Sequence, residues 1–308
     1  MISAITTILP IQPTQKQNRQ ISFCRIPIAH DTVSFSQNNL LAKPSEEITQ
    51  AVLSAKKDPK NYIGQGTEGI VYKIPDTNYC VKFPHKGSED MGKWSKTIYP
   101  QQEVNHIVAK SENNTVIMKY IDGESLFWGH EPKEIYSLPK QSYINLLKQL
   151  TDAHKKYMVF DNTPANIIYN VKDKSLTAID FYNEDSVEPR SFCPLSNVFS
   201  CIKAKGNTPE NKSDNRKLCG KLLNLVIDEL MSDKPQEFAV RKEDVIKMME
   251  ALRWSQRKDI PPQFDFLEKS MCNMIDLKYS QNKTEESQKQ FAGEIKYSKC
   301  IINQILSD

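Results

Sequence analysis

The feature that most constrains this chain is a set of polar residues placed between short apolar segments at residues 159–181. Asp161 is followed five residues later by Asn166 (VFDNTPANIIY), and Asp180 ends a second apolar segment (AIDF). The polar stretch 171–175 between them predicts a hairpin turn. Phosphoryl transfer requires a carboxylate near the incoming hydroxyl and oxygen ligands for Mg²⁺. The spacing therefore indicates Asp161 and Asn166 as catalytic residues, and Asn166 and Asp180 as metal ligands.

A glycine-rich loop precedes this segment. Residues 63–72 read IGQGTEGIVY, in which Gly64, Gly66 and Gly69 form the pattern GxGxxG. β-Branched residues follow the last glycine, which favours a strand–turn–strand loop over phosphates rather than the strand–turn–helix of a dinucleotide site. Alone, the pattern also fits an ordinary glycine hairpin. Lys82 ends the next apolar segment (YCVK), one hairpin later, and is the candidate partner of the α- and β-phosphates.

The chain divides into three parts that differ in composition and in the spacing of their apolar residues. Residues 1–45 are rich in Ser, Thr, Gln, Asn and Ile without helical or strand periodicity, which predicts a disordered leader. Residues 46–121 begin with a short helix and continue as apolar runs separated by turn residues, which predicts an antiparallel sheet. Residues 122–308 are mainly helical by period. A strand-rich part followed by a helix-rich part predicts an α+β fold of two lobes.

The predicted elements are strands at 70–74, 79–83 and 115–121 and helices at 47–56, 142–157, 214–232, 242–257, 262–279 and 284–306.

Composition argues against several classes of partner. The 41 Lys and Arg residues nearly balance the 38 Asp and Glu residues, so no strong field for nucleic acid is expected. No apolar run approaches the roughly 18 residues that a membrane span requires. The seven cysteines include no CxxC pair, which favours reduced thiols. The sequence does not indicate an oligomeric state.

The ordered set of glycine loop, lysine, aspartate, asparagine and aspartate resembles the protein-kinase-like superfamily over residues 62–184. The resemblance implies a bilobal protein-kinase-like fold, α+β in class. Its N-lobe would be a small antiparallel β-sheet at 46–121, and its helical C-lobe at 122–308 would have an atypical helical C-terminal part. ATP is then the phosphate donor and Mg²⁺ the metal, with Mn²⁺ as an alternative.

The same resemblance extends through residues 115–126 (TVIMKYIDGESL), which are similar to strand five and the hinge of that family. Val71 and Cys80 would cover the adenine, Met118 would be the gatekeeper, and the backbone of 119–121 would face the adenine. The implied nucleotide-binding residues are Ile63, Gly64, Gly66, Gly69, Val71, Cys80, Lys82, Glu89, Met118, Lys119, Tyr120 and Ile121.

The glutamate that pairs with Lys82 in this family has two candidates. Glu89 lies at a normal distance ahead of strand five but soon after Lys82, whereas Glu103 leaves little chain before that strand. We favour Glu89, and a solvated helix carboxylate is the alternative for either.

The sequence departs from the motifs of that family in three places. Val159 and Phe160 replace the His-Arg that precedes the catalytic aspartate, Tyr182 stands where a glycine follows Asp-Phe, and no Ala-Pro-Glu follows. In these respects the chain resembles the minimal kinases that bacterial pathogens and symbionts inject through type III secretion. That likeness implies a secreted virulence effector that acts in a host cytosol. A leader without a Sec signal fits this interpretation, and a cytoplasmic protein is the alternative.

The expected activity is transfer of the γ-phosphate of ATP to hydroxyl side chains of a host protein, with Ser and Thr favoured over Tyr. Two alternatives stay open: a small-molecule phosphotransferase of the aminoglycoside or choline kinase type, and a pseudokinase binding module. The substrate is not readable from the sequence. Trp94, Phe127, Trp128 and Trp254 are either surface anchors for a partner or core aromatics.

Overall fold

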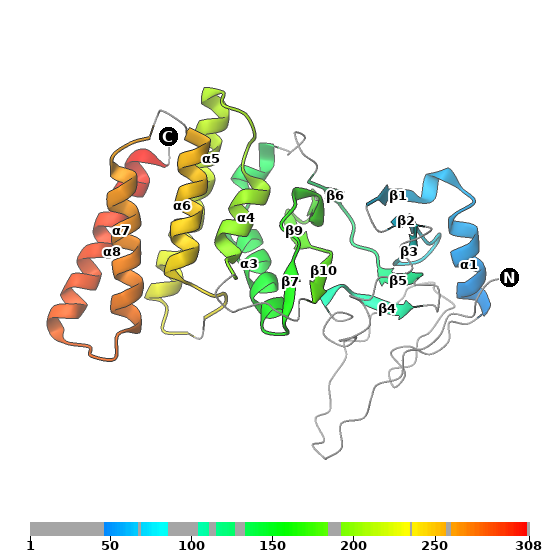
Figure 1. The fold of residues 1–308 in the computed structure, drawn as a ribbon, viewed down its shortest axis with the longest axis horizontal. Coiled ribbons are helices and arrows are strands. Elements are labelled where there is room, and N and C mark those ends of the chain that lie inside the picture. The colour runs from blue at the N-terminus through cyan, green and yellow to red at the C-terminus, as the bar shows by residue number, and fades with distance from the viewer. Residues whose placement is uncertain are drawn as a thin grey trace, which may run out of the picture. The chain divides into compact units, whose positions relative to one another are not determined.

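The computed structural model describes residues 46–66, 69–85, 104–110, 115–126, 133–183, 192–234, 236–256 and 260–306. The chain separates into two compact units, Met1–Ile121 (unit 1) and Asp122–Asp308 (unit 2). The predicted α+β class is confirmed, with a small antiparallel sheet and several helices (Figure 1). The predicted leader at 1–45 lies outside the described residues, as do Glu89, Glu103, Trp94, Phe127 and Trp128.

Unit 1 contains one sheet with the strand order β1-β2-β3-β5-β4, and all of its neighbouring strands are antiparallel. Its elements are α1 (Glu46–Ala55), the 3-10 helix η1 (Pro59–Asn61), β1 (Tyr62–Gln65), β2 (Gly69–Lys73), β3 (Tyr79–Pro84), β4 (Ile107–Lys110) and β5 (Val116–Lys119). The short helix and the three predicted strands are therefore confirmed, with bounds shifted by a few residues.

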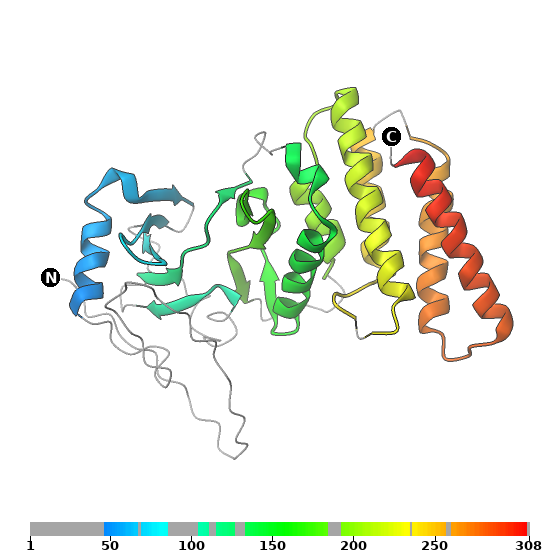
Figure 2. The ribbon, with the colours of Figure 1, turned by 180° about the vertical axis from the view of Figure 1, so that it is seen from behind.

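Helix α1 packs on one face of this sheet (Figure 2). Val52 and Ala55 of the helix are buried in a cluster with Val81, Ala109 and Ile117 of the strands. Successive side chains of a strand point to opposite faces, so the residues between these core positions belong to the other face of the sheet. Burying a side chain of this size contributes about 1.5–3 kcal/mol, which is enough to fix the register of each strand.

Unit 2 begins with two small sheets and continues as a row of helices. Its elements are β6 (Glu124–Ser125), the 3-10 helix η3 (Lys133–Ser137), α3 (Lys140–His154), β7 (Met158–Phe160), the 3-10 helix η4 (Pro164–Asn166), β8 (Ile167–Asn170), β9 (Ser175–Ala178), β10 (Phe181–Asn183), α4 (Pro194–Ile202), α5 (Pro209–Met231), α6 (Lys242–Gln256), α7 (Gln263–Tyr279) and α8 (Glu285–Ile305). One sheet has the order β6-β8-β9, and β7 pairs with β10 in the other.

The helices of unit 2 pack in succession away from the strands (Figures 1 and 2). Helix α3 packs on β7 and β9, α4 contacts both α3 and α6, and α7 pairs with α8 at the far end of the row. Side chains cap two of the helices, since Thr208 accepts from Asn211 N at α5 and Thr284 forms a capping box with Ser287 at α8. The five helices predicted for this part are confirmed as α3 and α5–α8. No helix in the described ranges combines the length and the apolar character needed to cross a bilayer.

Helix α4 was not predicted from the sequence. It is short, and Asp244 of α6 holds its first turn by accepting hydrogen bonds from Leu195 N and Ser196 N, both 2.8 Å long. These bonds satisfy N–H groups that a helix cannot pair internally. Burial nevertheless raises the pKa of the Asp244 carboxyl to about 7. A capping residue on a distant helix gives no local signal in the sequence, which explains the omission.

Candidate functional site

One strand pair, β7–β10, and the β8–β9 hairpin that it encloses in the sequence bring Asp161, Asn166 and Asp180 to one corner of unit 2. In the β7–β10 pair Phe160 lies opposite Phe181, so the residues that flank this pair, Asp161 and Asp180, lie across from each other. In the β8–β9 hairpin the Ile179 N–H donates to the Asn166 carbonyl at 2.8 Å. The corner is therefore set by backbone pairing that the segment 158–183 makes with itself.

Side-chain contacts order this corner further. The buried Asn166 amide donates to the Asp161 carbonyl oxygen at 3.2 Å and to Asp161 Oδ2 at 3.3 Å, while Asp161 itself is exposed to solvent. Asp161 can therefore meet a substrate while Asn166 fixes its orientation. Carboxylate and amide oxygens are ligands that Mg²⁺ can take in proteins, so Asp180 and Asn166 are the candidate metal ligands at this corner.

Asp180 has a backbone φ of 62°, in the left-handed region that non-glycine residues seldom adopt. The conformation is held on its C-terminal side by β10, where Tyr182 pairs with Val159, and by the contact of the Phe160 and Phe181 rings at 5.6 Å. Tyr182 therefore occupies a strand position and not a flexible turn. Val159 and Phe160 supply the other side of this ladder.

In unit 1 the strand register gathers several predicted nucleotide-binding residues on one face. Lys82 pairs with Val71, and Cys80 pairs with Met118, so these four side chains share the face opposite to α1. Burial raises the pKa of the Cys80 thiol to about 12, so it stays protonated and behaves as a small apolar group.

The three glycines of the loop have different surroundings. An added Cβ would meet nothing within 4 Å at Gly64 or Gly66, whereas at Gly69 it would overlap the Phe83 carbonyl of the neighbouring strand. Gly69 is therefore required by the close approach of β2 to β3, and Gly64 and Gly66 are the positions that leave space for a ligand. The half-exposed Ile63 precedes them in β1. The Gly66 carbonyl also lies 3.0 Å from His85 Nε2, a contact that the sequence analysis missed.

Two of the backbone donors predicted to face adenine are engaged inside unit 1. The Lys119 N–H donates to the His106 carbonyl at 3.0 Å, and the Tyr120 N–H donates to the Asn78 carbonyl at 2.7 Å. Among the described residues, none accepts a hydrogen bond from the Ile121 N–H. The Lys119 carbonyl also lies 4.0 Å from the Cys80 thiol, which can donate to it. Of the predicted segment, Ile121 N is thus the group best suited to an external ligand.

The end of α4 lies against the loop that carries Asp161. The buried Cys201 thiol donates to Asn162 Oδ1 at 2.9 Å, and burial raises its pKa to about 12, so the thiol keeps the proton that it donates. Asp161 and the lysines at 203 and 205 all act electrostatically on Cys201. The sequence analysis missed Cys201, Lys203 and Lys205. Predicting a short helix that begins at Pro194 would have drawn attention to these residues, which lie at and just after its end.

The comparisons with known proteins assign the chain to no family. A scan against protein-family models gives no match to the chain, and a search of curated proteins finds no similar sequence.

Within the part of the chain that the structure describes, no group of three or more His, Cys, Asp or Glu residues is arranged to hold a metal ion. The candidate metal ligands are one carboxylate, Asp180, and one amide, Asn166.

Proposed function

We propose that this protein is an ATP-dependent protein kinase of the protein-kinase-like fold, which transfers the γ-phosphate of ATP to Ser or Thr hydroxyls of a protein. The observation that carries the proposal is the corner of Asp161, Asn166 and Asp180, because strand pairing and one side-chain contact place near one another the kinds of group that phosphoryl transfer needs. The shared sheet face of Lys82, Val71, Cys80 and Met118 supports a nucleotide site in unit 1.

In this proposal each residue has a defined task. Asp161 accepts the proton of the acceptor hydroxyl, whose oxygen forms a bond to the γ-phosphorus as the bond to ADP breaks. Asn166 and Asp180 would hold Mg²⁺, which would neutralise charge on the phosphate oxygens. Lys82 binds the α- and β-phosphates, and the open positions at Gly64 and Gly66 let the loop backbone approach them.

The test is phosphate transfer by purified full-length protein to proteins of a host lysate, followed by phosphosite mass spectrometry. Asp161→Ala and Lys82→Ala should each lower transfer by at least about a hundredfold while the thermal unfolding midpoint stays unchanged. Asp173→Ala, which changes an exposed carboxylate in the β8–β9 turn, is the matched control. Transfer at the wild-type rate by either variant would refute the assignment.

A small-molecule phosphotransferase is the second candidate. The feature that favours it is the large helical part, α5–α8, which lacks the peptide-docking motif of protein kinases. Labelled ATP offered with aminoglycosides and amino alcohols, in parallel with the lysate, separates the two. Transfer only to small molecules would replace the protein-kinase proposal. Nucleotide binding without transfer to any acceptor, including the protein itself, would indicate a pseudokinase.

Delivery into a host cell belongs to the same proposal. It rests on the composition of residues 1–45 and on the resemblance to injected effector kinases. A reporter enzyme fused after residue 45 should reach the cytosol of a host cell only from bacteria with an intact type III apparatus. Equal delivery from a secretion-deficient strain would refute this part.

A further inference from the structure

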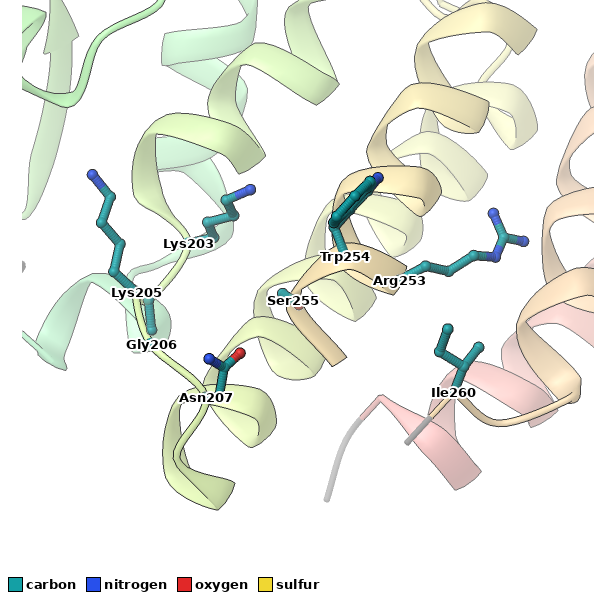
Figure 3. A pocket seen from close by; sticks show the side chains of 9 residues that line it. Lys203, Lys205, Gly206, Asn207, Arg253, Trp254, Ser255 and Ile260 are labelled. Carbon is teal, nitrogen blue, oxygen red and sulfur yellow. The ribbon is translucent and has the colours of Figure 1, made fainter. Parts of the chain in front are cut away.

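A basic cavity opens in unit 2 between the loop after α4 and the C-terminal end of α6 (Figure 3). Its volume is about 900 Å³. Lys203, Lys205 and Arg253 line it, and the described lining residues include no carboxylate. Trp254 and Ile260 supply an apolar side. A ligand that carries negative charge next to an apolar group would match both sides.

The charge that faces the cavity comes mainly from Lys203. Arg253 already pairs with Asp265 at 2.9 Å and with Glu268 at 2.6 Å. Lys203 forms no ion pair with any residue in the described ranges, and its side chain points toward α6 in Figure 3. Burial lowers the pKa of the Lys203 ammonium, so an anion that binds beside it would offset the cost of its desolvation.

The loop that carries the lysines is held in place by α5. Asn215 donates to the Ala204 carbonyl at 3.0 Å, and Asn211 donates to the Lys205 carbonyl. A loop that is positioned in this way loses little further freedom when a ligand binds. Trp254, in contrast, is 82% exposed, and a large indole left in water marks a surface suited to contact with a partner.

The cavity is connected to the candidate catalytic loop. Cys201 lies two residues before Lys203, and its thiol is bonded to Asn162, the residue after Asp161. Lys205 extends to the side away from α6 (Figure 3), and Asp161 acts electrostatically on the same thiol as both lysines. The loop that carries the two lysines is therefore joined through Cys201 to the loop that carries Asp161.

We propose that this cavity binds an acidic segment of the protein substrate, with Lys203 taking a Glu or Asp side chain and Trp254 packing on a neighbouring apolar residue. The inference rests on the proposed kinase function and specifies its substrate class. It selects acceptors whose hydroxyl lies near acidic and apolar residues.

The test is fluorescence anisotropy of labelled peptides of equal length with the purified full-length protein. One peptide surrounds a serine with Glu, Asp and Leu, and the other replaces the acidic residues by Lys. The acidic peptide should bind more tightly, and its affinity should fall as salt rises. Lys203→Glu should weaken its binding by at least about tenfold, and Lys203→Gln should weaken it less. Lys217→Glu, on the exposed side of α5, is the matched control and should not change the affinity.

Three results would overturn the inference: equal affinity for the two peptides, equal effects of Lys203→Glu and Lys217→Glu, or tighter binding of a single-stranded oligonucleotide than of the acidic peptide. Thermal unfolding of each variant shows that the comparison is between folded proteins. Binding to Asp161→Ala separates this inference from the proposed activity. Selective binding without transfer by the wild type would refute the activity alone, and transfer without charge preference would refute the cavity alone.

Discussion

The corner of Asp161, Asn166 and Asp180 and the basic cavity are both parts of unit 2, but they are assembled from different ranges of sequence. The corner is formed within residues 158–183 by the β7–β10 strand pair and the β8–β9 hairpin. The cavity joins the loop at 203–207 to residues 253–255 and Ile260, which are separated from that loop along the chain by α5 and most of α6. Its walls depend on side-chain bonds between helices.

This difference shows which functional residues can be recognised from the local sequence and which cannot. Groups that perform chemistry can be recognised from local order, because a hairpin turn and a strand register place them reproducibly. Residues that determine substrate specificity lie on surfaces formed by helices that are distant in the sequence. Their spacing along the chain therefore does not indicate which of them lie together. The predictions below test whether the two regions are separable in function.

The largest effect is expected from Asp180→Asn. Loss of this carboxylate removes a metal ligand from the corner, so phosphate transfer should fall by about a hundredfold or more, and the dependence of nucleotide binding on Mg²⁺ should weaken. Transfer of labelled phosphate and titration of a fluorescent nucleotide with and without Mg²⁺ measure the two effects. Asp173→Asn, the same change at the hairpin turn, should leave both unaltered. Similar behaviour of the two variants would contradict the assignment of the corner.

Gly69→Ala should lower the free energy of unfolding by about 2 kcal/mol or more, because a Cβ there overlaps the Phe83 carbonyl. Gly66→Ala, where the added Cβ meets nothing within 4 Å, should leave stability nearly unchanged but weaken nucleotide binding. Urea unfolding and nucleotide titration of the two variants distinguish a structural glycine from a ligand-facing one. Equal stability of the two variants would be evidence against the close strand approach.

Cys201→Val tests the connection between the two regions. It removes the donor to Asn162 while keeping an apolar side chain, and a hydrogen bond of this kind contributes about 1 kcal/mol. The expected result is a roughly fivefold lower kcat with unchanged nucleotide affinity. Cys201→Ser keeps a donor and should recover most of the activity. If Cys201→Val and Cys201→Ser have equal kcat, the contact does not position the catalytic loop.

The smallest effect on activity is expected from Asp244, whose pH dependence acts on stability and not on the candidate site. Burial raises its pKa in the folded state to about 7 from an ordinary value of 3.8. The folded state then holds a proton that the unfolded state releases, so stability decreases as pH rises from about 4 to about 7. The two backbone donors at Leu195 and Ser196 favour the ionised carboxyl and so limit the rise of its pKa.

Urea unfolding of wild type and Asp244→Asn at several pH values measures the difference. The wild type should lose stability relative to Asp244→Asn across that window. Glu243→Gln, at an exposed neighbouring position, should show no such dependence. A constant difference between wild type and Asp244→Asn would mean that the carboxyl is ionised throughout.

Much of the fold could be predicted from periodicity. The helices now seen as α3 and α5–α8 each carry an apolar stripe, and their ends coincide with turn residues or prolines. Helix α4 was not predicted, because its first turn is capped by Asp244, which lies far along the chain. For the candidate site, the sequence indicated Asp161, Asn166 and Asp180, but not His85 or Cys201, whose contacts span long separations.

By itself, the sequence determined which polar groups gather at the corner, because turn chemistry and strand alternation act between residues that are close along the chain. Only the tertiary structure decided that Gly69 is needed for strand packing, that the Lys119 and Tyr120 donors are already engaged, and that Lys203 lies beside the Asp161 loop. Those outcomes depend on which elements pack together, and packing joins residues whose spacing in the sequence carries no signal.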